Sequence, residues 1–304
     1  MIIPSPIQAM MVTGKMCAMK LAFHKLDGAG NDFVCLDWRG RKPLGNEEAG
    51  RLAVALCNRF HGIGADGLMF LEDPQVAGTH FTMHHMNSDG SFAEMCGNGS
   101  RCMARYAHFI GAAPLQMSFL TGAGVYRADV AGEAISTHFP DVESLPVEKN
   151  LLGPLKPFLS ATFLLVGVPH AVVFTEDLDL LDVNTVGREM RYDQAFAPAG
   201  TNLNFAEMKD GVLHVRTYER GVEAETQACG TGSVATACCY ARQKGLAGPV
   251  TLAISPTSGI RMAVSLTPTE RGFRDITLTG PGRIVFSGEC TVGDNYAVLE
   301  PQSK

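Results

Sequence analysis

Short apolar runs dominate the hydrophobic pattern of the chain and predict β-strands. Turn residues separate these runs at intervals typical of all-β or α+β proteins. The predicted strands are 21–26, 32–37, 67–72, 80–86, 125–130, 163–168, 170–174, 213–219, 250–254, 262–266 and 275–280.

Three stretches predict helices instead: about 46–59, 102–110 and 233–244. Asn46 is the expected N-cap of the first, because its side chain can accept a hydrogen bond from the first turn. The second carries apolar residues at helical spacing and ends at Gly111. Strands mixed with few helices indicate the α+β class.

The entrance to the second and third helices is repeated. CGNGSRCMARYA at 96–107 matches CGTGSVATACCY at 229–240 at the cysteine, both glycines, the serine and a nearby alanine. An Asn-Phe loop precedes each copy, GAGNDF at 28–33 and GTNLNF at 200–205. The repeat predicts two related, pseudo-symmetric α+β domains, with the repeated cysteines facing each other across the cleft between them.

Domain boundaries follow from composition. Residues 1–20 lack a basic n-region and contain early prolines, so we interpret them as a disordered extension or a misplaced start, not as a secretory signal. The first domain is predicted at 21–140 and the second at 141–288, divided near the polar, proline-bearing stretch at 140–150.

Composition excludes several classes of function. The net charge of −6 and the lack of a Lys/Arg block argue against binding to nucleic acid or to an anionic membrane. No apolar run approaches the roughly 20 residues of a membrane helix. Nine scattered cysteines are no disulfide framework and favour a reducing, cytoplasmic setting.

The repeated motif predicts acid/base chemistry on a carbon centre. The free amides and positive field of a helix start bind an anion and lower the pKa of a thiol. Cys96 and Cys229 are therefore candidate thiolate bases, each beside a cradle for a carboxylate. Inversion at an α-carbon needs one acid/base group on each face and stabilisation of an enediolate, and two facing copies would supply both.

Motifs spread along the chain resemble those of the diaminopimelate epimerases. They are GAGNDF at 28–33, NSDGSFAEMCGNGSRC at 87–102, VPH at 168–170, GTNLNF at 200–205 and YERGVEAETQACGTGS at 218–233. The resemblance runs from about Leu21 to about Glu300. It implies two similar domains, each a mixed or antiparallel sheet wrapped around a central helix, with a last strand at about 289–304 returning to the first domain.

The resemblance also implies roles for residues of this chain. Cys96 and Cys229 would be the acid/base pair, and His170 and Glu219 would tune these cysteines or hold the amino group. Arg220 would grip the distal carboxylate of the substrate, since arginine pairs bidentately with planar anions. The remaining expected substrate contacts are Asn31, Asn87, Gly97, Asn98, Asn202, Gly230 and Thr231.

Three departures from the family pattern concern the substrate end of the site. Val168 stands where asparagine is common, and Gly67 stands where some members carry a substrate-contacting glutamine. An additional residue in GVEAET at 221–226 would shift Glu225. Val168 removes a polar contact expected near the distal end of the substrate.

Other patterns in the sequence do not indicate a functional site. GIGADG at 62–67 fits a dinucleotide fingerprint, but it follows a helix and precedes a strand, the reverse of the required order. His84 and His85 would point to opposite faces of a strand, so with His80 they predict no metal site. Cys238 and Cys239 are expected in the core.

The sequence leaves three functions open. The first is a diaminopimelate epimerase that needs no cofactor or metal and forms a homodimer; its partner is a small amino-acid substrate. The second is a racemase of another amino acid, favoured by Val168. The third is a thiol redox or metal-binding protein that uses Cys96 and Cys229.

Overall fold

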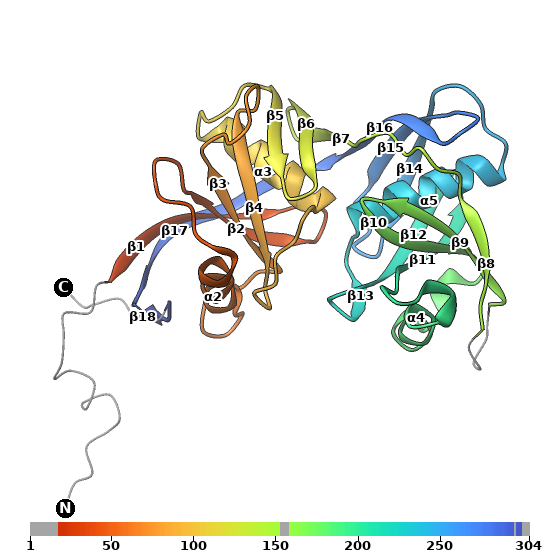
Figure 1. Ribbon diagram of the computed structural model, residues 1–304, viewed down its shortest axis with the longest axis horizontal. Helices are drawn as coiled ribbons and strands as arrows, with labels where there is room; N and C mark the ends of the chain where they lie inside the picture. Colours follow the sequence, from red (N-terminus) through yellow and green to blue (C-terminus); the bar gives the residue numbers. More distant parts are fainter. Residues whose placement is uncertain (1–17, 153–157, 295, 300–304) are drawn as a thin grey trace, which may run out of the picture.

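The computed structural model describes residues 18–152, 158–294 and 296–299. They form two lobes that lie side by side along the longest axis (Figure 1). The predicted extension at 1–20 lies almost wholly outside the described residues. The strands of the first lobe are β1 (Met19–Asp27), β2 (Asp32–Asp37), β3 (Gly67–Glu72), β4 (Phe81–Asn87), β5 (Gln116–Thr121), β6 (Gly124–Ala131) and β7 (Ala134–His138).

The strands of the second lobe follow in the chain. They are β8 (Val147–Asn150), β9 (Ser160–Val166), β10 (Val168–Phe174), β11 (Asn202–Lys209), β12 (Val212–Glu219), β13 (Ala224–Thr226), β14 (Val250–Pro256), β15 (Met262–Pro268) and β16 (Phe273–Pro281). The longer helices are α2 (Asn46–Cys57), α3 (Gly97–Phe109), α4 (Val183–Arg191) and α5 (Gly230–Gln243). Two 3₁₀ turns, η1 (Leu178–Leu180) and η2 (Gln194–Phe196), flank α4.

The connectivity of the first lobe recurs in the second. In the first, β1 and β2 are antiparallel, β2 and β3 are parallel across α2, and β4 and β5 are parallel across α3. In the second, β9 and β10 are antiparallel, β10 and β11 are parallel across α4, and β12 and β14 are parallel across α5. Each half then ends in an antiparallel run, β5–β6–β7 or β14–β15–β16. All strands belong to one mixed sheet.

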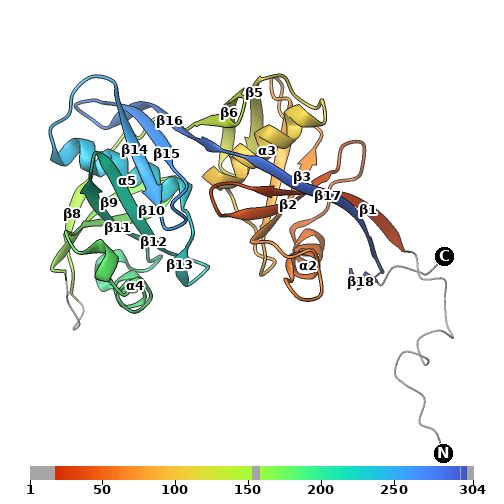
Figure 2. The same ribbon diagram turned by 180° about the vertical axis from the view of Figure 1, so that it is seen from behind.

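Two strand pairings join the halves. β7 and β16, the last strands of the two runs, are antiparallel neighbours, with Thr137 opposite Leu278. β17 (Arg283–Val292) then crosses behind the first lobe and pairs antiparallel with β1, from Asp27 opposite Arg283 to Met19 opposite Val292 (Figures 1 and 2). The returning strand thus begins upstream of the expected 289. A short β18 (Val298–Leu299) pairs with its end.

The helices α3 and α5 lie at the centre of the largest apolar core. Cys102, Met103 and Tyr106 of α3 and Val234 and Cys238 of α5 are all buried in it. Cys239 is buried there too, which confirms the core placement of both neighbouring cysteines. A second core packs α2 against β1–β3, and a third packs α4 against β10–β12.

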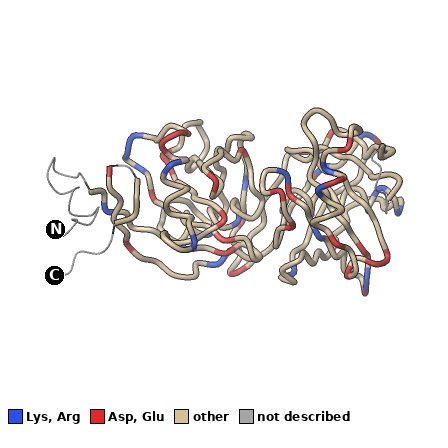
Figure 3. Tube along the Cα trace, turned by 90° about the horizontal axis from the view of Figure 1, so that it is seen from below, with Lys and Arg blue, Asp and Glu red and all other residues tan. Residues whose placement is uncertain are grey.

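The helix boundaries differ from those predicted. Gly45 is the N-cap of α2, and Asn46 is its first residue. The prediction of Asn46 as N-cap was wrong, because its side-chain oxygen bonds the ring of His84 instead of the helix backbone. No helix among the described residues has the length and apolar character to cross a membrane. Basic and acidic residues are interspersed over both lobes (Figure 3).

Candidate active site

The first turns of α3 and α5 contact each other between the lobes. Cys96 and Cys229 are their N-caps, both with extended backbone. A Cβ on Gly97 would lie 3.1 Å from the Cα of Gly230, and a Cβ on Gly230 would lie 2.9 Å from the Cα of Gly97. Only glycines allow this approach, so the repeated Cys-Gly pair brings both cysteines to one place.

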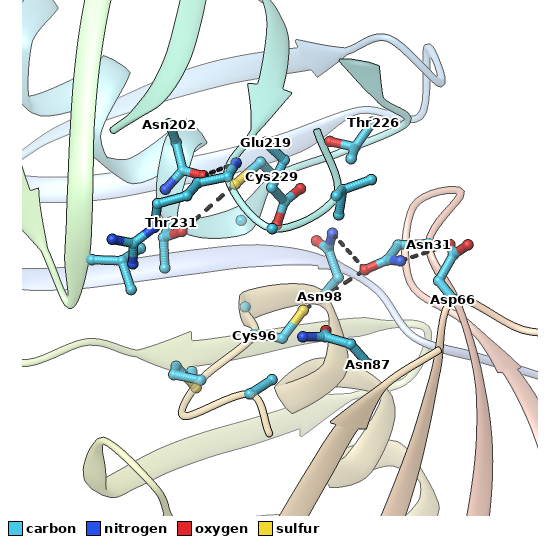
Figure 4. A pocket seen from close by; sticks show the side chains of 18 of the residues that line it. Asn31, Asp66, Asn87, Cys96, Asn98, Asn202, Glu219, Thr226, Cys229 and Thr231 are labelled. Atoms are coloured by element: carbon cyan, nitrogen blue, oxygen red, sulfur yellow. Dashed lines mark hydrogen bonds between the residues drawn. The ribbon is translucent and has the colours of Figure 1, made fainter. Parts of the chain in front are cut away.

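A cavity of about 670 Å³ opens in front of the two helix ends. That volume is typical of a small-molecule site. Of the site residues predicted from the sequence, only His170 does not line it. Those that line it, several of which are drawn in Figure 4, are Asn31, Asn87, Cys96, Gly97, Asn98, Asn202, Glu219, Arg220, Cys229, Gly230 and Thr231.

Asparagines connect Cys96 to the loop that bears Cys229. The Cys96 thiol lies 3.7 Å from Oδ1 of Asn31 and donates to it. The Asn98 Nδ2 donates to the same oxygen at 3.4 Å and to the carbonyl of Ala228 at 2.9 Å. The Asn31 amide is held from its other side by Asp66, whose Oδ2 accepts from Nδ2 at 2.8 Å. The orientation of both amides is therefore fixed by partners.

On the opposite wall of the cavity, the side chain of Asn202 forms hydrogen bonds to two backbone groups. Its Oδ1 accepts from the amide of Arg220 at 2.8 Å, and its Nδ2 donates to the carbonyl of Pro169 at 3.0 Å. The Arg220 guanidinium donates to the carbonyl of Ala199 at 3.4 Å and forms no ion pair among the described residues. Arg220 thus retains donors for an anion in the cavity.

The thiols differ from the prediction that the helix field lowers their pKa. Burial raises the pKa of Cys96 to about 11, although hydrogen bonds from the Gly99 and Asn98 amides act in the opposite direction. Burial, aided by the charge of Glu219, raises the pKa of Cys229 well above its usual value. Desolvation outweighs the helix ends at both thiols, because burial removes the water that would stabilise a thiolate.

Glu219 lies near both cysteines, and Figure 4 shows its carboxyl beside Cys229. Burial raises its pKa to about 7. A carboxyl with this pKa can hold or release a proton at neutral pH.

His170 lies behind the wall, fully buried on β10. Its Nδ1 lies 3.2 Å from the amide nitrogen of Asn204, so Nδ1 accepts and Nε2 carries the proton. Burial, with the charge of Arg220, lowers the pKa of His170 to about 3, which keeps the ring neutral. Asn204 in turn packs under the Cys229 loop, where a Cβ on Gly232 would meet its Oδ1 at 2.2 Å.

Comparison with known proteins accords with this arrangement. The sequence model of the family described as diaminopimelate epimerase matches residues 23–137 and 162–281. The chain belongs to the diaminopimelate epimerase family. It is 38% identical to the diaminopimelate epimerase of Gemmatimonas aurantiaca over 88% of this chain and 99% of that one. It is also 38% identical to that of Aquifex aeolicus, over 89% and 98%.

Solved structures outside the diaminopimelate epimerases share the fold at low identity. A phenazine biosynthesis protein of the PhzF family from Bacillus anthracis superposes with a TM-score of 0.70 at 17% identity, over 89% of this chain and 99% of that one. A hydroxyproline epimerase from Agrobacterium vitis gives 0.68 at 16%, over 92% and 93%. Such likeness shows the architecture alone.

The structure shows the surroundings of the three positions at which a departure from the family pattern was expected. Val168 lines the cavity. A Cβ on Gly67 would lie 2.7 Å from Nε2 of His85, so the imidazole occupies the space that a side chain at 67 needs. Glu225 also lines the cavity, but Arg216 holds it in an ion pair at 2.7 Å.

Sequence reasoning missed several residues at the site. Asp66 lies within GIGADG, a segment judged only as a dinucleotide motif; its position between a helix and a strand was the available signal. Arg191 and His85 line the cavity from elements with no motif of their own. No cluster of metal-ligating side chains occurs among the residues that the structure describes.

Proposed function

We propose that the protein is a cofactor-independent isomerase that interconverts LL- and meso-2,6-diaminopimelate, a step toward lysine and peptidoglycan precursors. The observation that carries this proposal is the meeting of two cysteine-capped helix starts at Gly97 and Gly230, in front of one cavity. Family membership supplies the substrate.

In this proposal the α-carboxylate binds the amides of both first turns, at Gly97, Asn98, Gly230 and Thr231. Helix-end amides favour an anion and would stabilise the enediolate formed when the α-hydrogen leaves. One cysteine, as thiolate, takes that hydrogen and becomes a thiol. The opposite cysteine delivers its proton to the other face of the carbon and becomes the thiolate.

The raised thiol pKa values suit this exchange. A thiolate formed in a desolvated site is a strong base, which the weakly acidic α-hydrogen requires. One thiol proton must leave before turnover, and Glu219, with its pKa of about 7, opposes the resulting thiolate only while it is ionised. The distal carboxylate would pair with Arg220, whose guanidinium has donors to spare.

We further propose that the two halves are domains, 21–140 and 141–288, each a sheet around its central helix, α3 or α5. The repeated connectivity and the β7–β16 pairing support a pseudo-twofold axis that passes between Gly97 and Gly230. A cytoplasmic homodimer belongs to the same proposal, and light scattering of the purified protein tests its mass.

The test of function is exchange at Cα. Purified protein in deuterated water should exchange and invert the α-centres of diaminopimelate, followed by NMR, and should leave other amino acids unchanged. Activity should survive chelation by EDTA. A protein that is inactive on diaminopimelate but racemises another amino acid would support the second function, for which Val168 is the specific argument. Bound metal, or a required disulfide, in active protein would support the third.

A further inference from the structure

Arg101 is the largest fully buried side chain described, with no exposed surface. It lies on α3, one turn after Gly97, beneath the floor of the cavity. No carboxylate among the described residues forms an ion pair with it. A buried cation without a counter-ion is costly and therefore rare. The burial of Arg101 without an ion pair therefore indicates a specific role for its charge and its hydrogen-bond donors.

Each of its three nitrogens donates a hydrogen bond, but only to neutral groups. Nη1 donates to the Gly97 carbonyl at 3.0 Å, and Nη2 donates to Oδ1 of Asn98 at 2.8 Å. From the other half, the Pro281 carbonyl accepts from Nε at 3.3 Å, and the sulfur of Met262 lies 3.3 Å from Nη2. Arg101 therefore binds the first turn of α3 to β15 and β16.

Glycines of the second half leave space for Arg101, Gly280 for its guanidinium and Gly282 for its backbone. A Cβ on Gly280 would lie 3.2 Å from Nε of Arg101, and a Cβ on Gly282 would lie 2.9 Å from its carbonyl oxygen. Gly280 lies on β16 and Gly282 lies between β16 and β17, both far from Arg101 in the sequence. Arg101 is therefore part of the interface between the halves.

The bond to Asn98 determines which way that amide points. Arginine has only donors, so the Asn98 atom that faces it must be the oxygen. The Nδ2 atom then faces the carbonyl of Ala228 and Oδ1 of Asn31. Ala228 precedes Cys229, and Asn31 accepts from the thiol of Cys96. One arginine thus fixes an amide that touches the surroundings of both cysteines.

We propose that Arg101 is a positioning residue of the epimerase. It orients Asn98 so that the Cys96 and Cys229 loops stay in register, and it supplies Cys96 with a positive charge that forms no ion pair with a carboxylate of the described residues. The inference rests on the proposed function, because it assigns Arg101 to the two-cysteine site. Among the charged groups around Cys96, Arg101 favours the thiolate and Glu219 opposes it.

Three variants test the proposal. Arg101→Met removes the charge and the donors, and Arg101→Lys keeps the charge but loses the fork that reaches Asn98 and Gly97 together. Arg105→Met is the matched control, because Arg105 lies one turn further along α3, is partly exposed and donates only to the carbonyl of Gly132.

Two measurements follow: kcat and KM for diaminopimelate, and the pH dependence of Cys96 alkylation by iodoacetamide, mapped by peptide mass. We expect Arg101→Met to lower kcat about 100-fold with KM changed less than about threefold. Its alkylation profile should move upward by about one pH unit. Arg101→Lys should lower kcat about tenfold and leave the profile near that of the wild type. Arg105→Met should change neither.

The alkylation profile does not depend on which substrate is natural, so failure of this inference is separable from failure of the proposed function. A folded Arg101→Met with wild-type kcat and profile overturns the inference. A loss of kcat that follows only the loss of folded protein, with an unchanged profile, shows a structural role and also overturns it. If Arg101→Met does not fold, Arg101→Lys decides: lower kcat at unchanged melting temperature supports the inference, and wild-type kcat contradicts it.

Discussion

Gly97 and Gly230 face each other so closely that a Cβ on either would lie within 3.1 Å of the other's Cα. The atoms that would clash are backbone, which cannot rotate away as a side chain can. The contact sets the separation of the two helix starts and hence of the two cysteines. The geometry needed for inversion thus depends on a pair of residues that carry no chemistry of their own.

Alanine at either position should therefore separate the helix ends. We expect Gly97→Ala and Gly230→Ala each to lower kcat/KM about 100-fold, since misplacement by about 1 Å has effects of that order. The effects should not multiply in the double variant, because one displacement serves both. Gly45→Ala is the control: this N-cap has φ −68° and open space around it. Unchanged kinetics in either active-site variant would show that the reaction tolerates a wider separation of the two helix ends.

Serine at either cysteine should abolish epimerisation in both directions. The serine hydroxyl is a far weaker acid than a thiol, so no base forms at neutral pH. Turnover of Cys96→Ser and Cys229→Ser is measured from either stereoisomer, with the half-buried Cys290 on β17 replaced as control. Retention of more than about a tenth of wild-type turnover, a loss of less than about 1.4 kcal/mol, would refute the two-base assignment.

Val168 lines the cavity as the first residue of β10 and presents an apolar wall. A hydrogen bond from asparagine to a charged group contributes about 1.5–3 kcal/mol. If Arg220 and the asparagines already hold the distal end of diaminopimelate, Val168→Asn changes its KM only modestly, and this is the outcome we expect. A gain of about tenfold or more in kcat/KM would indicate a natural substrate with a less polar end. Leu165→Asn, at an exposed position on β9 outside the cavity, is the control.

Acid should destabilise the protein through its buried imidazoles. Burial lowers the pKa of His85 to about 4 and that of His170 to about 3, from 6.5. Between these values and 6.5 the unfolded chain binds more protons, so stability present above pH 6.5 is lost as pH falls. Each histidine should cost about 2 kcal/mol between pH 6.5 and 5.

Urea unfolding measures this dependence. His85→Leu should remove the contribution of His85 to this loss of stability. The substitution breaks no hydrogen bond, because neither ring nitrogen of His85 has a partner among the described residues. His61→Leu, at an exposed site, should leave the dependence unchanged. Equal slopes for the wild type and His85→Leu would contradict a lowered pKa at His85.

The repeat around Cys96 and Cys229 locates the candidate site, because each copy combines a helix start with a thiol, and in the structure both cysteines line one cavity. The helix starts themselves were predicted several residues too late, since the Gly-rich first turns have poor helix propensity and form through tertiary contact. Helix α4 was missed for a related reason: Gly187, a poor helix former, lies in its middle and packs on Tyr218, where a Cβ would lie 2.5 Å from the Tyr218 Cβ.

Arg101 could not be assigned from the sequence, because its partners are brought to it only by the fold, and for Asp66 the sequence offered only its position between a helix and a strand. The acceptors of Arg101 are a neighbour on its own helix and groups on β15 and β16. The lowered thiol pKa was predicted from the helix field alone, whereas the burial that raises it instead depends on how the two halves pack around the cysteines.

The pairing of β17 with β1 has a consequence for how the chain is made. Because Met19 lies opposite Val292, one edge of β1 has no partner until residues 283–292 have been synthesised. The second half can close its own sheet earlier, so the lobe synthesised first is completed last. During translation that bare edge can recruit strands from other chains. This topology therefore favours slow completion of the first lobe, which is typical of long-range strand pairing.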